Sequence, residues 1–145
     1  MKYEYNDETQ LSAHFNAKEF RCKCGKTHDT ELNPKLVDNL EKLYRVLGCS
    51  KIIVTSGYRC SAHDKAVGGN GTGQHTKGNA ADIICYGQDG NIISTKKVAC
   101  KAQDIGFGGI GNIDRTYTAI HVDVRTSAKW YGDEAVRGGT SGSVT

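Results

Sequence analysis

Near its end the chain alternates between apolar and polar residues over Ile120-His-Val-Asp-Val124. In an extended segment residues i and i+2 face the same side, so His121 and Asp123 project together while the three apolar residues pack on the opposite face. Such alternation is typical of a strand with one buried face. We therefore predict a last strand over 117–124 that carries a histidine and an acid on one side.

A second apolar run, Ala80-Ala-Asp-Ile-Ile-Cys85, is interrupted by one acid. A carboxylate among apolar neighbours is costly unless it is paired, hydrogen-bonded or bound to a cation. A glycine-rich loop delivers His75 directly into this run. Zinc sites that do chemistry usually take three ligands from His, Asp, Glu or Cys. The sequence therefore predicts one Zn²⁺ ion held by His75, Asp82 and His121, with Asp123 left over for proton transfer.

Each of these residues also has a simpler interpretation. His121 would be an ordinary half-buried histidine, and a structural salt bridge would account for Asp82 or Asp123. The arginines available for such a bridge are Arg59 and Arg125. Taken singly, each residue favours the simpler interpretation, but their concentration in two apolar segments favours a shared site.

The length of 145 residues is close to the commonest size of a single domain. We expect one domain over residues 1–137 and a frayed, polar tail over 138–145. With 37% hydrophobic residues, 18 glycines and one proline, the composition favours a loop-rich protein of mixed secondary structure over an all-helical bundle.

The charge pattern and the first residues limit the partners. The net charge is +3 without a block of like charges, so we expect no nucleic-acid partner. The first eight residues lack the apolar core of a signal peptide, and no run approaches the roughly eighteen apolar residues of a membrane span. We expect a monomer without a membrane span, synthesised in the cytoplasm without a signal peptide.

Six cysteines are present, at positions 22, 24, 49, 60, 85 and 100. A domain of this size is stable without cross-links, and a cytoplasm is reducing, so we expect free or incidentally paired thiols. Cys22-Lys-Cys24-Gly-Lys-Thr-His28 has the residue types of half a zinc site. Its Cys-x-Cys spacing is unusual and no second cysteine pair follows, which favours simple packing of small thiols in a loop.

Three helices are predicted. Asn16 and Glu19 have the spacing of a capping box, which predicts a short helix within 13–21. Apolar residues recur at intervals of three and four over Pro34–Leu47, between Asn33 and Gly48. A third helix is predicted over 94–105.

Strands and loops fill the rest of the chain. The β-branched run over 51–56 predicts a strand, and Asp89-Gly90 predicts a hairpin turn. Residues 60–78 are predicted to form one long polar loop, which at this length is usually functional or disordered. The glycine pattern at 106–111 lacks the preceding strand and following helix of a dinucleotide site.

Several segments together resemble the M15 family of zinc D,D- or L,D-peptidases, and within it the short wall-hydrolase branch. They are Ser56-Gly-Tyr-Arg-Cys60, Val67-Gly-Gly69, Gln74-His-Thr-Lys-Gly-Asn-Ala-Ala-Asp-Ile83, Gly108-Gly-Ile-Gly111 and Ile120-His-Val-Asp-Val-Arg125. The resemblance covers roughly residues 13–131. It implies a small α+β domain of the hedgehog/D-Ala-D-Ala peptidase type, in which an antiparallel sheet carries the zinc site and helices pack on the other face.

The resemblance also implies roles for individual residues. His75 and Asp82 match the zinc ligands of a His-x6-Asp motif, and His121 matches the ligand of a His-x-Asp motif. Arg59 matches an arginine that contacts substrate and stabilises the oxyanion. Candidates for substrate binding lie beside these motifs: Tyr58, Arg59 and Gln74.

Two positions depart from the family pattern. Gly73 stands where relatives often have serine, and Thr118 stands where many relatives have the acid that serves as general base. Asp123 shares the strand face of His121, so we predict that Asp123 is the base. Asp114, in the preceding turn, is the fallback.

The resemblance implies a metallopeptidase that hydrolyses peptide bonds in bacterial peptidoglycan, as an endopeptidase or a carboxypeptidase. The bond could be D-Ala-D-Ala, L-Ala-D-Glu or a cross-bridge. We expect a phage-type endolysin that degrades the cell wall after passing a holin pore. One alternative is a catalytically degenerate module that holds zinc and binds a wall peptide or a protein. Another is a soluble protein with a structural metal and no connection to the wall.

Overall fold

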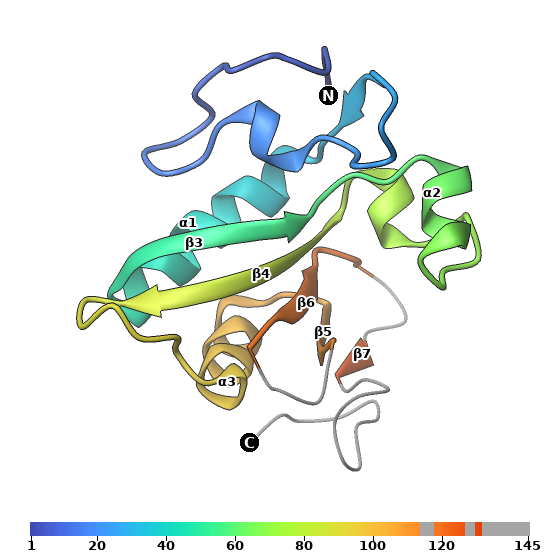
Figure 1. The fold of residues 1–145 in the computed structure, drawn as a ribbon. Helices are drawn as coiled ribbons and strands as arrows, with labels where there is room; N and C mark the ends of the chain where they lie inside the picture. Colours follow the sequence, from blue (N-terminus) through green and yellow to red (C-terminus); the bar gives the residue numbers. More distant parts are fainter. Residues whose placement is uncertain (114–117, 127–129, 132–145) are drawn as a thin grey trace.

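The computed structural model describes residues 1–113, 118–126 and 130–131. In chain order its elements are β1 (Lys2–Tyr3), the 3-10 helix η1 (Ala17–Phe20), β2 (Thr30–Glu31), α1 (Pro34–Leu47), β3 (Cys49–Ser56), α2 (Ser61–Ala66), the 3-10 helix η2 (Gln74–Lys77), β4 (Ala80–Gly87), α3 (Thr95–Ile105), β5 (Gly109–Asn112), β6 (Ile120–Asp123) and β7 (Trp130–Tyr131). Figure 1 shows their arrangement.

The main sheet has the strand order β3-β4-β6-β5-β7. Its first four strands pair antiparallel, and β7 pairs parallel with β5. β1 and β2 form a separate antiparallel pair. The combination of an antiparallel sheet with separate helices confirms the predicted α+β class.

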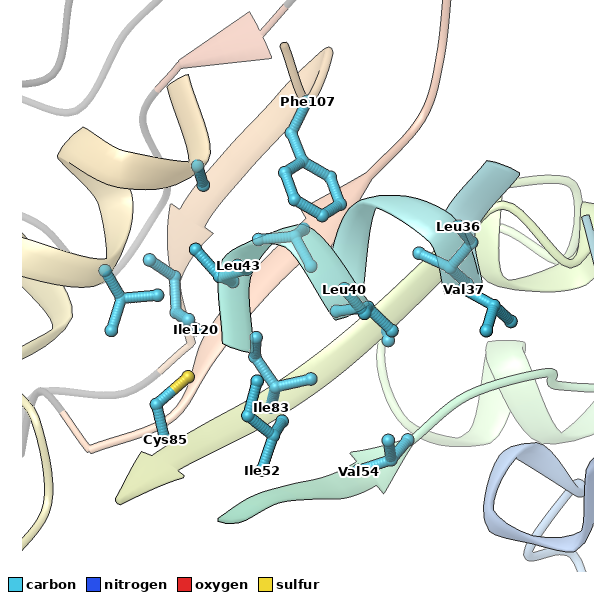
Figure 2. Close-up of a cluster of buried hydrophobic side chains, with 14 of the residues drawn as sticks. Leu36, Val37, Leu40, Leu43, Ile52, Val54, Ile83, Cys85, Phe107 and Ile120 are labelled. Atoms are coloured by element: carbon cyan, nitrogen blue, oxygen red, sulfur yellow. The ribbon is translucent and has the colours of Figure 1, made fainter. Parts of the chain in front are cut away.

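The core lies between the main sheet and the helices α1 and α3. Leu36, Leu40 and Leu43 of α1 are fully buried, and Figure 2 shows them over strand side chains that include Ile83 and Ile120. Burying a leucine side chain contributes about 1.5 to 3 kcal/mol. Because the helices occupy one face of the sheet, the opposite face is left for the polar residues of β4 and β6.

The bounds of α1 follow from its two ends. The Asn33 side chain accepts a hydrogen bond from the Lys35 N–H at 3.0 Å, and Pro34 occupies the first turn. Gly48 ends the helix with φ 64°, a left-handed conformation that glycine adopts without strain. These bounds confirm the prediction over Pro34–Leu47.

The other helical predictions are confirmed with adjustments. The capping box of Asn16 and Glu19 is present, but the helix that it begins is the 3-10 helix η1. Ser94 caps α3 by accepting from the Lys97 N–H at 3.3 Å. At the predicted hairpin turn, the Gly87 N–H donates to the Asn91 carbonyl at 2.9 Å.

The predictions for loops were partly wrong. Residues 60–78 contain α2 and η2 instead of one long loop. The Asp64 carboxylate accepts from the Gly71 N–H at 3.0 Å, so one buried acid orders the glycine-rich segment. The glycine pattern at 106–111 contains the start of β5, which has too few β-branched residues to be predicted as a strand.

Two further predictions concern the C-terminal tail and membrane-spanning helices. The tail over 138–145 lies outside the described residues. No helix within the described ranges is long and apolar enough to cross a membrane.

Candidate metal centre

The three predicted ligands come from three elements and meet on the polar face of the sheet. Asp82 of β4 lies directly opposite His121 of β6 in the strand register. His75 lies in η2, just before β4. His75 Nε2 and His121 Nδ1 each lie 3.2 Å from Asp82 Oδ1. The two imidazole nitrogens are also 3.2 Å apart.

Hydrogen bonds on the outer ring nitrogens indicate the tautomers. His75 Nδ1 lies 2.7 Å from the Gly57 carbonyl oxygen, which can only accept. His121 Nε2 lies 2.7 Å from Asp123 Oδ2, which accepts as a carboxylate. In the neutral tautomers both outer nitrogens carry the proton, so both inner nitrogens present lone pairs. Two lone pairs and a carboxylate oxygen then converge, an arrangement that a cation stabilises.

The spacing of these atoms fits zinc. Ligand nitrogen and oxygen atoms about 2.0 to 2.1 Å from Zn²⁺ in a tetrahedron are separated by about 3.3 Å. The three separations here are all 3.2 Å. His75, Asp82 and His121 therefore form a group able to hold a metal ion, as their sequence pattern predicts.

Burial and hydrogen bonding shift the pKa values of this group in opposite directions. Burial raises the pKa of Asp82, but hydrogen bonds from His121 and His75 outweigh it and hold that pKa well below its usual range. Burial lowers the pKa of His121, but hydrogen bonds to Asp123 and Asp82 outweigh it and raise that pKa to about 9. Without a metal, a proton on His121 neutralises part of the acidic charge, so metal binding must displace it.

Asp123 lies on the far side of the His121 ring from the other two ligands. Its carboxylate is fully buried and accepts from His121 Nε2 and from Arg125 Nε and Nη2, the latter two at 2.9 and 2.7 Å. These contacts are those of a group that orients a ligand imidazole. The general-base role of Asp123 stays a prediction, and Asp114 lies outside the described residues.

Close backbone packing holds Asp123 in this place. A side chain on Gly109 of β5 would put its Cβ 2.0 Å from Asp123 Oδ2, so only glycine fits there. The neighbouring Gly108 N–H donates to the Asp123 carbonyl at 2.9 Å. The glycines at 108 and 109 thus allow the backbone of this segment to pack directly against Asp123, which contacts the candidate ligand His121.

Arg59 is held by two acids and a hydroxyl. It donates to Asp64 Oδ1, to Asp82 Oδ2 and to Ser56 Oγ, each at 3.0 Å. The salt bridge between Arg59 and Asp82, expected as an alternative, is therefore present beside the metal group. Asp64 was not predicted as part of the site, because no local sequence pattern places it beside Arg59.

A cleft of about 520 Å³ opens over the ligands. Its described lining residues are Arg59, Val67, Gly68, Gly69, His75, Asp82, Asn112, Ile113, His121 and Arg125. Tyr58 and Gln74, predicted to bind substrate, are not in this set. The Tyr58 N–H donates to the Phe20 carbonyl at 2.9 Å, and the Gln74 side chain accepts from Asn79 at 3.0 Å.

The two positions that depart from the family pattern are both described. Gly73 lies just before η2 with φ −77°, and a Cβ there would meet no atom closer than 4.0 Å. A serine would therefore fit without rearrangement. Thr118 lies just before β6 and is partly buried.

Comparisons with known proteins agree with this geometry. A model of the peptidase M15 family matches residues 13–123, which include all three candidate ligands and most of the chain. A search of curated proteins found no match. The chain therefore belongs to the peptidase M15 family, which implies a metallopeptidase.

Proposed function

We propose that this protein is a zinc-dependent peptidase that hydrolyses peptide bonds in the stem peptides or cross-bridges of bacterial peptidoglycan. The observation that carries the proposal is the triangle of His75 Nε2, Asp82 Oδ1 and His121 Nδ1, with all three separations at 3.2 Å. Its edges match a tetrahedral zinc site, and it lies in an open cleft.

A bound zinc ion would supply a Lewis acid that activates water and polarises a peptide carbonyl. The chain's own residues orient the ligands. Gly57 fixes the His75 ring and Asp123 fixes the His121 ring, each through one hydrogen bond of 2.7 Å. Such contacts to ligand imidazoles are commonly worth 10- to 100-fold in metal affinity or activity.

Two arginines at the cleft support a peptide substrate, whose carbonyl and carboxylate oxygens accept hydrogen bonds from guanidinium groups. Arg59 and Arg125 both line the cleft, and guanidinium groups bind carboxylates and peptide carbonyls well. Peptidoglycan stem peptides carry free carboxylates. Arg59 would also offset charge that develops on the scissile carbonyl oxygen, a contribution commonly worth about 3 to 4 kcal/mol.

Solubilisation of purified sacculi tests the proposal. The zinc-loaded protein should release soluble peptides and new amino termini. His75→Ala and Asp82→Ala proteins, shown to be folded by circular dichroism, should release almost none. If the two variants solubilised sacculi as fast as the parent, the proposed centre would not be the catalytic one.

A second candidate is a catalytically degenerate module that holds zinc and binds a wall peptide. Thr118 replaces the acid of many relatives, and Asp123 is directed to the outer nitrogen of His121. Among the described residues that line the cleft, Asp82 is the one carboxylate. Stable binding to several kinds of sacculi without any new amino termini would favour this candidate.

The biological setting is also a proposal. An enzyme with this substrate would suit lysis of the host wall by a phage, with access through a holin pore. A holin reading frame beside the gene would support this setting. A position among genes for wall recycling would contradict it.

A further inference from the structure

Three cysteines from two distant parts of the chain meet outside the candidate metal centre. Cys22 and Cys24 lie in the loop after η1, and Cys60 lies between β3 and α2. One sulfur atom from each lies within 4.8 Å of the other two. Figure 1 shows the N-terminal segment beside the end of β3 that leads into α2. The cysteine pair found in the sequence therefore acquires the third thiol that its spacing did not predict.

The three sulfurs lie close enough together to share one metal ion, and two of them accept hydrogen bonds from backbone N–H groups. A tetrahedral zinc ion with Zn–S bonds of about 2.3 Å separates its sulfurs by about 3.8 Å. The Cys60 N–H donates to Cys22 Sγ at 3.3 Å, and the His63 N–H donates to Cys60 Sγ at 3.4 Å. Donors of this kind stabilise thiolate charge.

The environment of the three thiols also fits a structural ion. Cys22 is fully buried, whereas Cys24 and Cys60 are partly exposed and leave a path for metal entry. One disulfide would use only two of the three sulfurs, whereas a metal ion engages all of them.

We propose that Cys22, Cys24 and Cys60 hold a second, structural zinc ion. A water molecule would complete the tetrahedron. The ion would tie the N-terminal segment to residues 57–60. This inference is independent of the proposed peptidase activity.

The tied segment supports the candidate metal centre. Gly57 accepts from His75 Nδ1 at 2.7 Å, and the Arg59 N–H donates to the His75 carbonyl at 3.2 Å. A Cβ on Gly57 would lie 2.8 Å from the Phe20 backbone, so the two segments are already in close contact. A structural ion would keep this contact fixed and with it the orientation of His75 and Arg59.

Metal content and cobalt spectra test the inference. Protein expressed and purified under reducing conditions with zinc should contain two zinc ions per chain. A Cys22→Ser/Cys24→Ser double variant should contain one, and a Cys100→Ser control should keep two. With Co²⁺, the parent and Asp82→Ala proteins should show the sulfur-to-cobalt charge-transfer absorption, because the other centre has no thiolate. One zinc ion per parent chain and no such absorption would overturn the proposal.

A measurement on the parent protein covers the case in which the double variant fails to fold. Cys24 and Cys60 should resist alkylation in the zinc-loaded protein and react at least roughly tenfold faster after a chelator removes the metal. Peptide mapping should show an unchanged rate at Cys100. Equal rates at Cys24 and Cys60 with and without metal, or a disulfide among the three cysteines in the purified protein, would contradict the site.

Discussion

His121 connects the candidate ligands to the groups that orient them. Its Nδ1 lies 3.2 Å from Asp82, and its Nε2 lies 2.7 Å from Asp123. Strand geometry predicted that Asp123 and His121 share a face, and they do. The side of the imidazole that each acid meets could not be predicted, because it depends on the side-chain rotamers and on the approach of β5. Which nitrogen of His121 the Asp123 carboxylate contacts decides whether Asp123 is placed to act as a general base or to orient the imidazole.

Asp123→Asn therefore distinguishes two roles. If Asp123 orients His121, the variant should bind zinc roughly 10- to 100-fold more weakly and lose activity in proportion. Competition with a chelator of known affinity measures the zinc binding, and the exposed Asp104→Asn is the control. Loss of activity at unchanged zinc affinity would instead support the general-base role.

Arg59→Ala should destabilise the metal-free protein. The variant leaves two buried acids, Asp64 and Asp82, without their shared partner. Removing one partner of a buried ion pair typically costs about 3 to 5 kcal/mol, and we expect the lower end because Arg59 is partly exposed. Denaturant unfolding followed by circular dichroism gives the free energy.

Two further variants complete the Arg59 experiment. Arg59→Lys should rescue little, since an ammonium group lacks the fork that reaches both acids. The exposed Lys42→Ala should be neutral. A free energy of unfolding for Arg59→Ala within about 0.5 kcal/mol of the parent would contradict a stabilising role of the ion pairs that Arg59 forms with Asp64 and Asp82.

At the scale of elements, the long helix was predictable and the short strands were not. α1 has both caps and a strong apolar period, so its bounds follow from local rules. β5 consists of Gly-Ile-Gly-Asn, whose glycines have no strand preference. β5 is defined by its pairing with β6, which a local sequence pattern does not predict. β1 and β2 were also missed, because two residues carry no periodic signal.

Gly109→Ala should damage the metal centre through β5. The new Cβ would lie 2.0 Å from Asp123 Oδ2, so the carboxylate and the His121 ring must shift. We expect a loss of about 1 to 3 kcal/mol in the free energy of unfolding, as for other overpacked sites, together with weaker zinc binding.

Gly73→Ala is the matched control for this variant. Its Cβ would meet nothing closer than 4.0 Å, and its φ of −77° suits any residue. The free energy should change by less than about 0.5 kcal/mol. Equal changes in the free energy of unfolding for the two variants would contradict the view that the close contact between residue 109 and the Asp123 carboxylate excludes a side chain.

For the whole molecule, the clustering of the three candidate ligands could be predicted because their residue types interrupt two apolar segments. His75, Asp82 and His121 do come together across β4, β6 and η2. The third thiol of the cysteine group and the salt bridge of Asp64 could not be predicted. Both depend on how residues 57–71 fold back on other segments, which no local pattern encodes.

The stability of the metal-free protein should depend on pH in a specific direction. Burial lowers the pKa of His121, but its two acidic partners raise it from 6.5 to about 9. The charged imidazole therefore stabilises the folded state fully below pH 6.5, and this stabilisation is lost as the pH rises to about 9. Chelator-treated protein should unfold more easily at pH 9 than at pH 6.5.

Zinc should reverse the loss of stability between pH 6.5 and pH 9. It binds the deprotonated imidazole of His121, and it competes better with the proton as the pH rises. A His121→Asn protein without metal should show a much weaker decline above pH 6.5. Thermal unfolding measured by circular dichroism across this range provides the data. Equal or greater stability of the metal-free parent at pH 9 would contradict the assigned contacts of His121.

Mass spectrometry of muropeptides tests whether this protein is a zinc-dependent peptidase of peptidoglycan. Purified sacculi are digested with the zinc-loaded protein, with the same preparation after chelation, and with the chelated protein after zinc is restored. We expect one type of stem or cross-bridge bond to be cleaved with a new amino terminus, and we expect this cleavage to be lost on chelation and regained with zinc. Intact muropeptides after prolonged digestion with folded, zinc-loaded protein, or equal cleavage without metal, would contradict it.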